Sequence, residues 1–197
     1  MKKYWRQLKL SLAKLAKPKA KNVLGVDLST NSFAFCVFNG SPIKWGKIKF
    51  SGTSIYDKIV DANKKSLALK NELNVDYICI ESAIMVRSQD VAIKMAMVVG
   101  SVVSSLADKK DMIVTVPPSA WQPYIKNNNF TKAEKDALRL EYPSKSDEWY
   151  RNKSREIRKQ RTMNFFNERF SLNISDNDVG DSMGIAYYAY HKLVNSD

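Results

Sequence analysis

Four acidic residues lie at positions where a cation-dependent site could be built. Asp27 interrupts the apolar run of "NVLGVDLSTNSFAFCVF" just before a polar turn, and Glu81 ends the apolar segment "VDYICIE". A carboxylate that is buried without a partner is costly, so such an acid is usually neutralised, paired or bound to a cation. Asp178 and Asp181 are spaced i and i+3, which puts both on one face of a helix.

If these four carboxylates converge, they cannot all ionise unless cations hold them. Hard oxygen ligands of this kind select Mg²⁺ or Mn²⁺. Two such ions about 3.5–4 Å apart can stabilise both the attacking and the leaving oxygen of an in-line displacement at phosphorus. The set therefore predicts a nuclease with two Mg²⁺ ions per active site, for which Mn²⁺ can substitute.

A structural role for part of this set stays open. Ser175 can cap the last helix and, together with Asp178, fits a capping box, and acids in a first turn favour the helix dipole. Capping explains Asp178, but Asp181 lies too far inside the helix to need it. Asp176 is expected at the start of this helix.

The elements that must position these acids follow from the hydrophobic pattern. Strand-like runs at 23–28, 32–38 and 43–50 are joined by short polar turns, which predicts an antiparallel meander. A helical segment at 54–73 leads into the continuously apolar strand 75–81, and an apolar helix at 90–108 leads into a strand at 112–116. The order βββαβαβ predicts an α/β fold with a mixed sheet covered by helices.

Composition indicates one domain with a polyanionic partner. The 197 residues, 44% of them hydrophobic, can form a single core over 22–197, preceded by a basic extension at 1–21. The 32 Lys and Arg against 20 Asp and Glu give a net charge of +12, and the excess gathers at 1–21 and in a basic insertion at 126–161. This balance suits nucleic acid, although a charged stretch can also be only a solvated surface.

The two cysteines and the lack of a targeting segment indicate a compartment. Cys36 and Cys79 lie inside apolar runs without metal-type spacing and are expected to be reduced core residues. With no secretory signal and no long uninterrupted apolar run, we expect a cytoplasmic protein that is neither secreted nor membrane-bound. Residues 1–21 can form a basic amphipathic helix, which either packs on the domain or contacts DNA.

Four sequence blocks carry a resemblance to a known family. "GVDLSTNSFAF", "ICIESAIMVRSQDVAIKMAMVVG", "VPPSAW" and "DVGDSMGIAYYA", in this order, resemble the blocks of the RuvC-like Holliday-junction resolvases, members of the RNase H-like superfamily. The resemblance spans about residues 23–191. It implies a five-stranded mixed sheet of order 3-2-1-4-5 flanked by helices, with Asp27, Glu81, Asp178 and Asp181 as metal ligands.

The same resemblance implies a partner and a reaction. The protein is expected to act as a homodimer that grips a four-way DNA junction and nicks two opposed strands, leaving 5′-phosphates and 3′-hydroxyls. The symmetry of a dimer matches that of the junction.

Some positions depart from the pattern of the bacterial members. Leu28 and Ser29 stand where those enzymes have Pro-Gly, and Ile84, followed by Met85, stands where they usually carry a stacking aromatic. An apolar wedge remains available to enter a base step, and cleavage of other branched DNA becomes plausible.

The basic residues expected to contact DNA lie in two places. Arg87 follows the wedge, and a family lysine near the active site could correspond to Lys153, Arg155 or Arg158. Divergence of this kind resembles phage-encoded members, which work in a bacterial cell or a phage-infected host.

Other functions are compatible with some of the same residues. An RNA–DNA hybrid hydrolase or a transposase-type nuclease would use the same carboxylates on another substrate. "GVDLSTNS" also resembles the phosphate loop of the actin and Hsp70 ATPases, but those proteins need two such domains. A non-catalytic architectural DNA-binding protein would use the carboxylates only as caps and ion-pair partners.

Overall fold

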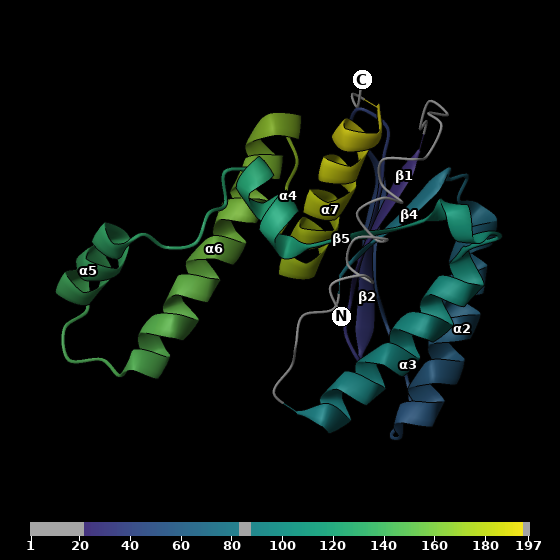
Figure 1. Cartoon of the computed structure of the whole chain (residues 1–197), viewed down its shortest axis with the longest axis horizontal. Coiled ribbons are helices and arrows are strands. Elements are labelled where there is room, and N and C mark those ends of the chain that lie inside the picture. The colour runs from purple at the N-terminus through teal and green to yellow at the C-terminus, as the bar shows by residue number, and fades with distance from the viewer. Residues whose placement is uncertain (1–21, 83–87, 195–197) are drawn as a thin grey trace, which may run out of the picture.

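A computed structural model of the chain describes residues 22–82 and 88–194. Its centre is a five-stranded sheet in the order β3-β2-β1-β4-β5 (Figure 1). The strands are β1 (Val23–Leu28), β2 (Ser32–Phe38), β3 (Pro42–Lys49), β4 (Tyr77–Glu81) and β5 (Ile113–Val116). β2 pairs antiparallel with both β1 and β3, and β4 pairs parallel with both β1 and β5. The predicted α/β fold with a mixed sheet of order 3-2-1-4-5 is confirmed.

Helices cover both faces of the sheet (Figure 1). They are α2 (Ile55–Glu72), α3 (Gln89–Leu106), the short 3₁₀ helix η1 (Lys110–Met112), α4 (Pro118–Tyr124), α5 (Lys132–Glu141), α6 (Asp147–Phe170) and α7 (Asn177–Val194). One core layer joins the sheet to α2 and α3, and the other joins it to α7, α4 and α6. Residues 126–158, which we call the arm, comprise a loop, α5 and the first half of α6, and project away from this body (Figure 1).

The alternation of side chains along a strand decides which residues face α7. In β1, Val23 packs in the layer of α7 and Leu24 in the layer of α2 and α3. Asp27 is four residues from Val23 and shares its face. In β4, Cys79 lies in the α7 layer, so Glu81 lies on that face too.

Capping side chains fix the ends of two helices. Ser54 and Asp57 form a reciprocal capping box at the start of α2, within the segment that the sequence predicted as helical. At α7, the Asp176 carboxylate accepts from the backbone N–H groups of residues 178 and 179 at 2.9 and 3.3 Å. Asp176 is therefore the N-cap, as expected for a residue at the helix start, and the prediction that Ser175 caps this helix is wrong. The Asp176 carboxylate reaches two free N–H groups of the first turn.

The two cysteines belong to the core, whereas the apolar helix α3 is only partly buried. Cys36 and Cys79 are free thiols with no exposed surface, as predicted. By length and composition α3 could cross a membrane; Val98 and Val102 are fully buried, but only 22% of this helix is buried in the structure. The basic extension at 1–21 lies outside the described residues.

Candidate active site

Helix α7 lies directly on strand β1 because the strand carries a glycine at the contact. A Cβ on Gly25 would lie 2.2 Å from the Ser182 carbonyl oxygen and 2.6 Å from the Ala186 backbone nitrogen. Any side chain at this position would have to push the helix away. The close approach brings the first turns of α7, with Asp178 and Asp181, over the end of β1 that carries Asp27.

Two carboxylates share a largely buried space at this point. Burial, followed by the charges of Asp181 and Glu81, raises the pKa of Asp27 from 3.8 to about 8. Burial also raises the pKa of Asp181 from 3.8 to about 7, with Glu81 and Asp178 adding to the rise. The other acids therefore make the ionised forms of Asp27 and Asp181 less favourable, as expected for carboxylates that share one site.

A tryptophan orients the third carboxylate. The indole Nε1 of Trp121 donates a hydrogen bond to Glu81 Oε1 at 2.9 Å. Trp121 is 1% exposed, and its ring occupies the space where Gly184 of α7 has no side chain. Burial raises the pKa of Glu81, and the hydrogen bond from Trp121 opposes that rise. Trp121 thus anchors the site from within the core and is not available to stack on bases.

The fourth carboxylate is held by lysines. Lys47 of β3 contacts Asp178 at 2.6 Å and Asp176 at 3.1 Å, and Lys159 of α6 lies 3.8 Å from Asp178. The positive charge of Lys159 also lowers the pKa of Asp27 and Asp181, against the larger effect of burial. Sequence reasoning missed both lysines.

The basic residues that were predicted to contact DNA differ in how near they lie to the carboxylates. Lys153 pairs with Glu156 at 3.1 Å, and Arg155 lines a cavity in the arm. Arg158 is electrostatically coupled to Asp181: burial lowers the pKa of its guanidinium, and the charge of Asp181 opposes this. Of the three candidates for the family lysine, Arg158 is the one coupled to the carboxylates. The other three DNA-contact candidates, Ile84, Met85 and Arg87, lie outside the described residues.

The donor set fits hard divalent cations in its chemistry. All four acids offer carboxylate oxygens, and the raised pKa values of Asp27 and Asp181 reflect burial and, after it, repulsion among the acids, both of which a bound cation would offset. As the side chains stand, no three Asp, Glu, His or Cys residues of the described ranges converge into a ready-made metal-binding group. Asp178 instead pairs with Lys47, so gathering the acids around an ion requires side-chain movement.

Comparisons with known proteins identify the fold. No protein-family model matches the sequence, and no curated protein matches it significantly. RuvC of Thermus thermophilus, solved in complex with a Holliday junction substrate, is similar in structure, with a TM-score of 0.60, 11% sequence identity, and coverage of 86% of this chain and 93% of RuvC. The yeast mitochondrial Holliday junction resolvase is similar with a TM-score of 0.51 and 14% identity, over 96% of this chain and 85% of that protein. The chain has the fold of the RuvC-like resolvases, which confirms the resemblance at the level of fold.

Proposed function

We propose that this protein is a divalent-metal-dependent endonuclease that resolves four-way DNA junctions by paired symmetric nicks and also cuts other branched DNA. The observation that carries the proposal is the electrostatic coupling of Asp27, Glu81 and Asp181 on three different elements of a RuvC-like fold. Carboxylates whose pKa is raised by burial and by neighbouring acids are typical of functional sites.

The residues divide the work of phosphodiester hydrolysis between them. Asp27, Glu81, Asp178 and Asp181 would hold Mg²⁺, for which Mn²⁺ can substitute; bound there, the ions supply an activated water and neutralise charge at the phosphorus. Trp121 keeps the Glu81 carboxylate oriented through its N–H donor. Lys47 and Lys159 hold the charge of Asp178, and Arg158 adds a positive charge near Asp181.

The substrate follows from charge and from the two similar structures. A chain of net charge +12 suits a polyanion, and the arm contributes +3 of this charge, from nine Lys and Arg against six Asp and Glu. One similar protein was solved with a Holliday junction, and the other is described as a Holliday junction resolvase. We assign Lys153, Arg155 and Arg158 to the DNA backbone, and Ile84, Met85 and Arg87 to the centre of the junction.

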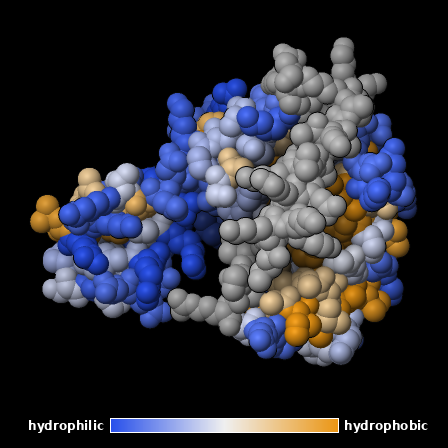
Figure 2. All heavy atoms as spheres, viewed as in Figure 1, coloured by the Kyte–Doolittle hydropathy of each residue, from blue (hydrophilic) through white to orange (hydrophobic). Residues whose placement is uncertain are grey.

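A homodimer is part of the proposal because two symmetric nicks need two active sites. Large apolar side chains on α2 and α3 are exposed, among them Tyr56 at 68%, Val60 at 54% and Ile93 at 61%. Figure 2 shows hydrophobic side chains on this surface, whereas the arm is largely hydrophilic. Exposed apolar surface of this kind favours association. Light scattering should give a dimer for the wild type and a monomer for Ile93→Lys, and a monomeric wild type would remove this part of the proposal.

Cleavage of a labelled synthetic four-way junction tests the function. The junction is compared with a flap, a linear duplex and an RNA–DNA hybrid, each with Mg²⁺, Mn²⁺ or EDTA. We expect paired symmetric nicks that disappear in EDTA. Preferred cutting of the hybrid would indicate a hybrid hydrolase, and metal-independent binding without cutting would indicate an architectural protein.

Variants that remove charge but little volume connect the activity to the site. Asp27→Asn, Glu81→Gln and Asp181→Asn should each abolish cleavage and preserve junction binding. Asp136→Asn, at an exposed position on α5, is the matched control and should cut normally. Full cutting by any of the three site variants would exclude that residue from the catalytic set.

A further inference from the structure

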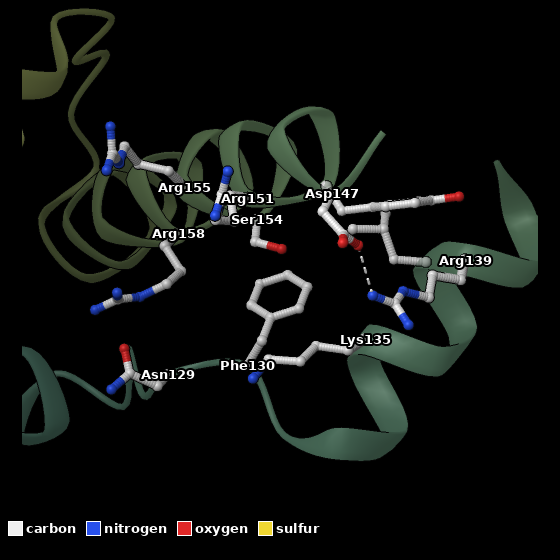
Figure 3. A pocket seen from close by; sticks show the side chains of 11 residues that line it. Asn129, Phe130, Lys135, Arg139, Asp147, Arg151, Ser154, Arg155 and Arg158 are labelled. Atoms are coloured by element: carbon white, nitrogen blue, oxygen red, sulfur yellow. Dashed lines mark hydrogen bonds and ion pairs between the residues drawn. The ribbon is translucent and has the colours of Figure 1, made fainter. Parts of the chain in front are cut away.

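The arm contains a cavity that the proposed metal site does not use. α5, the first half of α6 and the loop that precedes α5 line this cavity (Figure 3), which is open to solvent and has a volume of about 660 Å³. This volume lies in the range of pockets that bind small molecules and single monomers of a polymer.

The cavity gathers positive charge without enough counter-charge. Five cationic side chains line it: Lys135, Arg139, Arg151, Arg155 and Arg158. The one carboxylate among the lining residues, Asp147, already pairs with Arg139 at 2.9 Å. In the described part of the chain, Lys135, Arg151 and Arg155 form no ion pair. Like charges that share a cavity repel one another unless an anion lies between them, so the lining favours an anionic ligand.

An aromatic ring lies in the middle of this positive surface. Phe130 projects between α5 and α6 (Figure 3), and the Arg161 guanidinium lies 4.8 Å from the centre of its ring. Phe130 is half-buried, and the rest of its ring lines the cavity together with Tyr150. A site for inorganic phosphate alone does not need an exposed aromatic ring, whereas a nucleic-acid base stacks on one.

Hydrogen bonds and ion pairs build the cavity in advance. The buried Asn127 amide donates to the Arg158 carbonyl oxygen at 2.9 Å and to Thr162 Oγ1 at 2.8 Å, which holds the loop on α6. Arg161 pairs with Glu134 at 2.7 Å and so connects α6 to the capping box of α5. Nε of Arg158 is buried and has no hydrogen-bond partner among the residues of known placement. Such a pre-formed site binds its ligand with little ordering cost.

We propose that the arm cavity captures one unpaired nucleotide of a DNA single strand, with its base stacked on Phe130 and its flanking phosphates bound by Arg151 and Arg155. This inference rests on the proposed function in one respect: the single strand is taken to be part of the DNA that the nuclease cuts. A paired base would have to leave its duplex to enter, which costs unstacking energy, so the cavity favours nucleotides that are already unpaired.

Helix α6 connects the cavity to the carboxylates. From Arg151 to Lys159, which lies 3.8 Å from Asp178, the helix advances eight residues, about 12 Å at 1.5 Å per residue. A DNA strand covers this distance in a few nucleotides, at about 3.4 Å each along a duplex axis. The captured nucleotide would therefore lie a few positions from the phosphate that is cut. This favours substrates with unpaired nucleotides beside the branch, such as flaps and open junctions.

Binding of short labelled DNA by the full-length protein in EDTA tests the proposal without cleavage. Fluorescence anisotropy is measured with fluorescein-labelled octathymidylate, with an octamer of abasic residues that keeps the phosphates, and with an eight-base-pair duplex. We expect the octathymidylate to bind about tenfold more tightly than the abasic octamer, as expected for one stacked base. Phe130→Leu should abolish this preference and leave abasic binding unchanged, whereas Phe130→Tyr should retain it.

The phosphate contacts are tested by charge-matched variants. Arg151→Gln with Arg155→Gln should weaken binding of both octamers about tenfold. Lys132→Gln with Lys145→Gln, which removes two positive charges of the arm outside the cavity, should weaken it much less. Equal effects of the two pairs would overturn the phosphate assignment.

Three results would overturn the capture of a nucleotide: equal wild-type affinity for thymidylate and abasic octamers, a preference that survives Phe130→Leu, or equal affinity for the duplex. The proposed function is tested separately, by cleavage of the junction with Mg²⁺ or Mn²⁺. If no cleavage occurred, the preference for thymidylate over abasic DNA in EDTA would still be expected.

Discussion

Replacing Asp27 by asparagine in the metal-free protein should stabilise it, and the gain should grow with pH. In the wild type, burial and the neighbouring acids raise the pKa of Asp27 from 3.8 to about 8. An acid whose pKa is raised by folding destabilises the folded state progressively as the pH rises from the unfolded to the folded pKa. At about 1.4 kcal/mol per pKa unit, the cost is about 2 kcal/mol at pH 5 and about 5 kcal/mol at pH 8.

Asparagine carries no charge and avoids this cost. Asp27→Asn should therefore exceed the wild type in free energy of unfolding by about 5 kcal/mol at pH 8 and by about 2 kcal/mol at pH 5. Urea unfolding followed by circular dichroism in EDTA at pH 5, 6.5 and 8 measures this difference. Added Mg²⁺ should then stabilise the wild type at pH 8 and the variant much less, because a ligand stabilises only the state that binds it.

Asp136→Asn supplies the comparison, since it removes a carboxylate from an exposed position. If Asp27→Asn and Asp136→Asn change stability equally at all three pH values, Asp27 does not share a buried site with other acids. The proposed metal site would then lose its main support.

Further variants test the parts around the carboxylates. Trp121→Phe removes the N–H donor to Glu81, and the Mg²⁺ concentration for half-maximal cleavage should rise about tenfold, as is typical when the partner of a metal ligand is lost. Lys159→Gln removes a charge that lowers the pKa of two carboxylates, so cleavage should fall several-fold at pH 7 and recover towards pH 9; an unchanged pH profile would contradict the assignment. Gly25→Ala should destabilise the protein by at least about 3 kcal/mol in urea unfolding, because its Cβ would overlap the α7 backbone. Gly100→Ala, where the added Cβ meets nothing within 4 Å, should stabilise α3 by about 0.5–1 kcal/mol.

The hydrophobic pattern was sufficient to predict the sheet and the helices α2, α3 and α7, but not α6, the longest helix, most of which fell in the predicted basic insertion. The apolar runs after Asn22 and before Glu81 are continuous because β1, β2 and β4 are covered on both faces, whereas the edge strand β3 is only partly buried. The order of strands came from the resemblance to the resolvases, since the pattern alone predicted only a mixed sheet. Ser175 was mistaken for the N-cap because two capping residues stand side by side, and the sequence does not decide between them.

The cationic partners of the carboxylates could not be predicted from the sequence. Lys47 lies on β3, two strands from Asp27. It contacts Asp178 because side chains alternate between the two faces of a strand, and Lys47 is on the face that α7 covers. Lys159 follows Arg158 in a stretch rich in basic residues, and only the packing of α6 against α7 shows which of them approaches the acids. Both contacts join residues more than 15 positions apart in the chain and depend on tertiary structure.

The small residues around the acids explain how four like charges are held near one another. Repulsion alone would separate β1, β4 and α7, so the packing between these elements must be tight enough to oppose it. Gly25, two residues before Asp27, lets α7 contact the strand through backbone atoms. Gly184, three residues after Asp181, leaves room for the Trp121 ring, whose N–H reaches Glu81. The glycines of the two motifs are therefore part of the site: each one fixes the distance between the element that carries one acid and the element that carries or orients another. A substitution at either glycine should reduce metal binding even though neither residue has a side chain that could contact the ion.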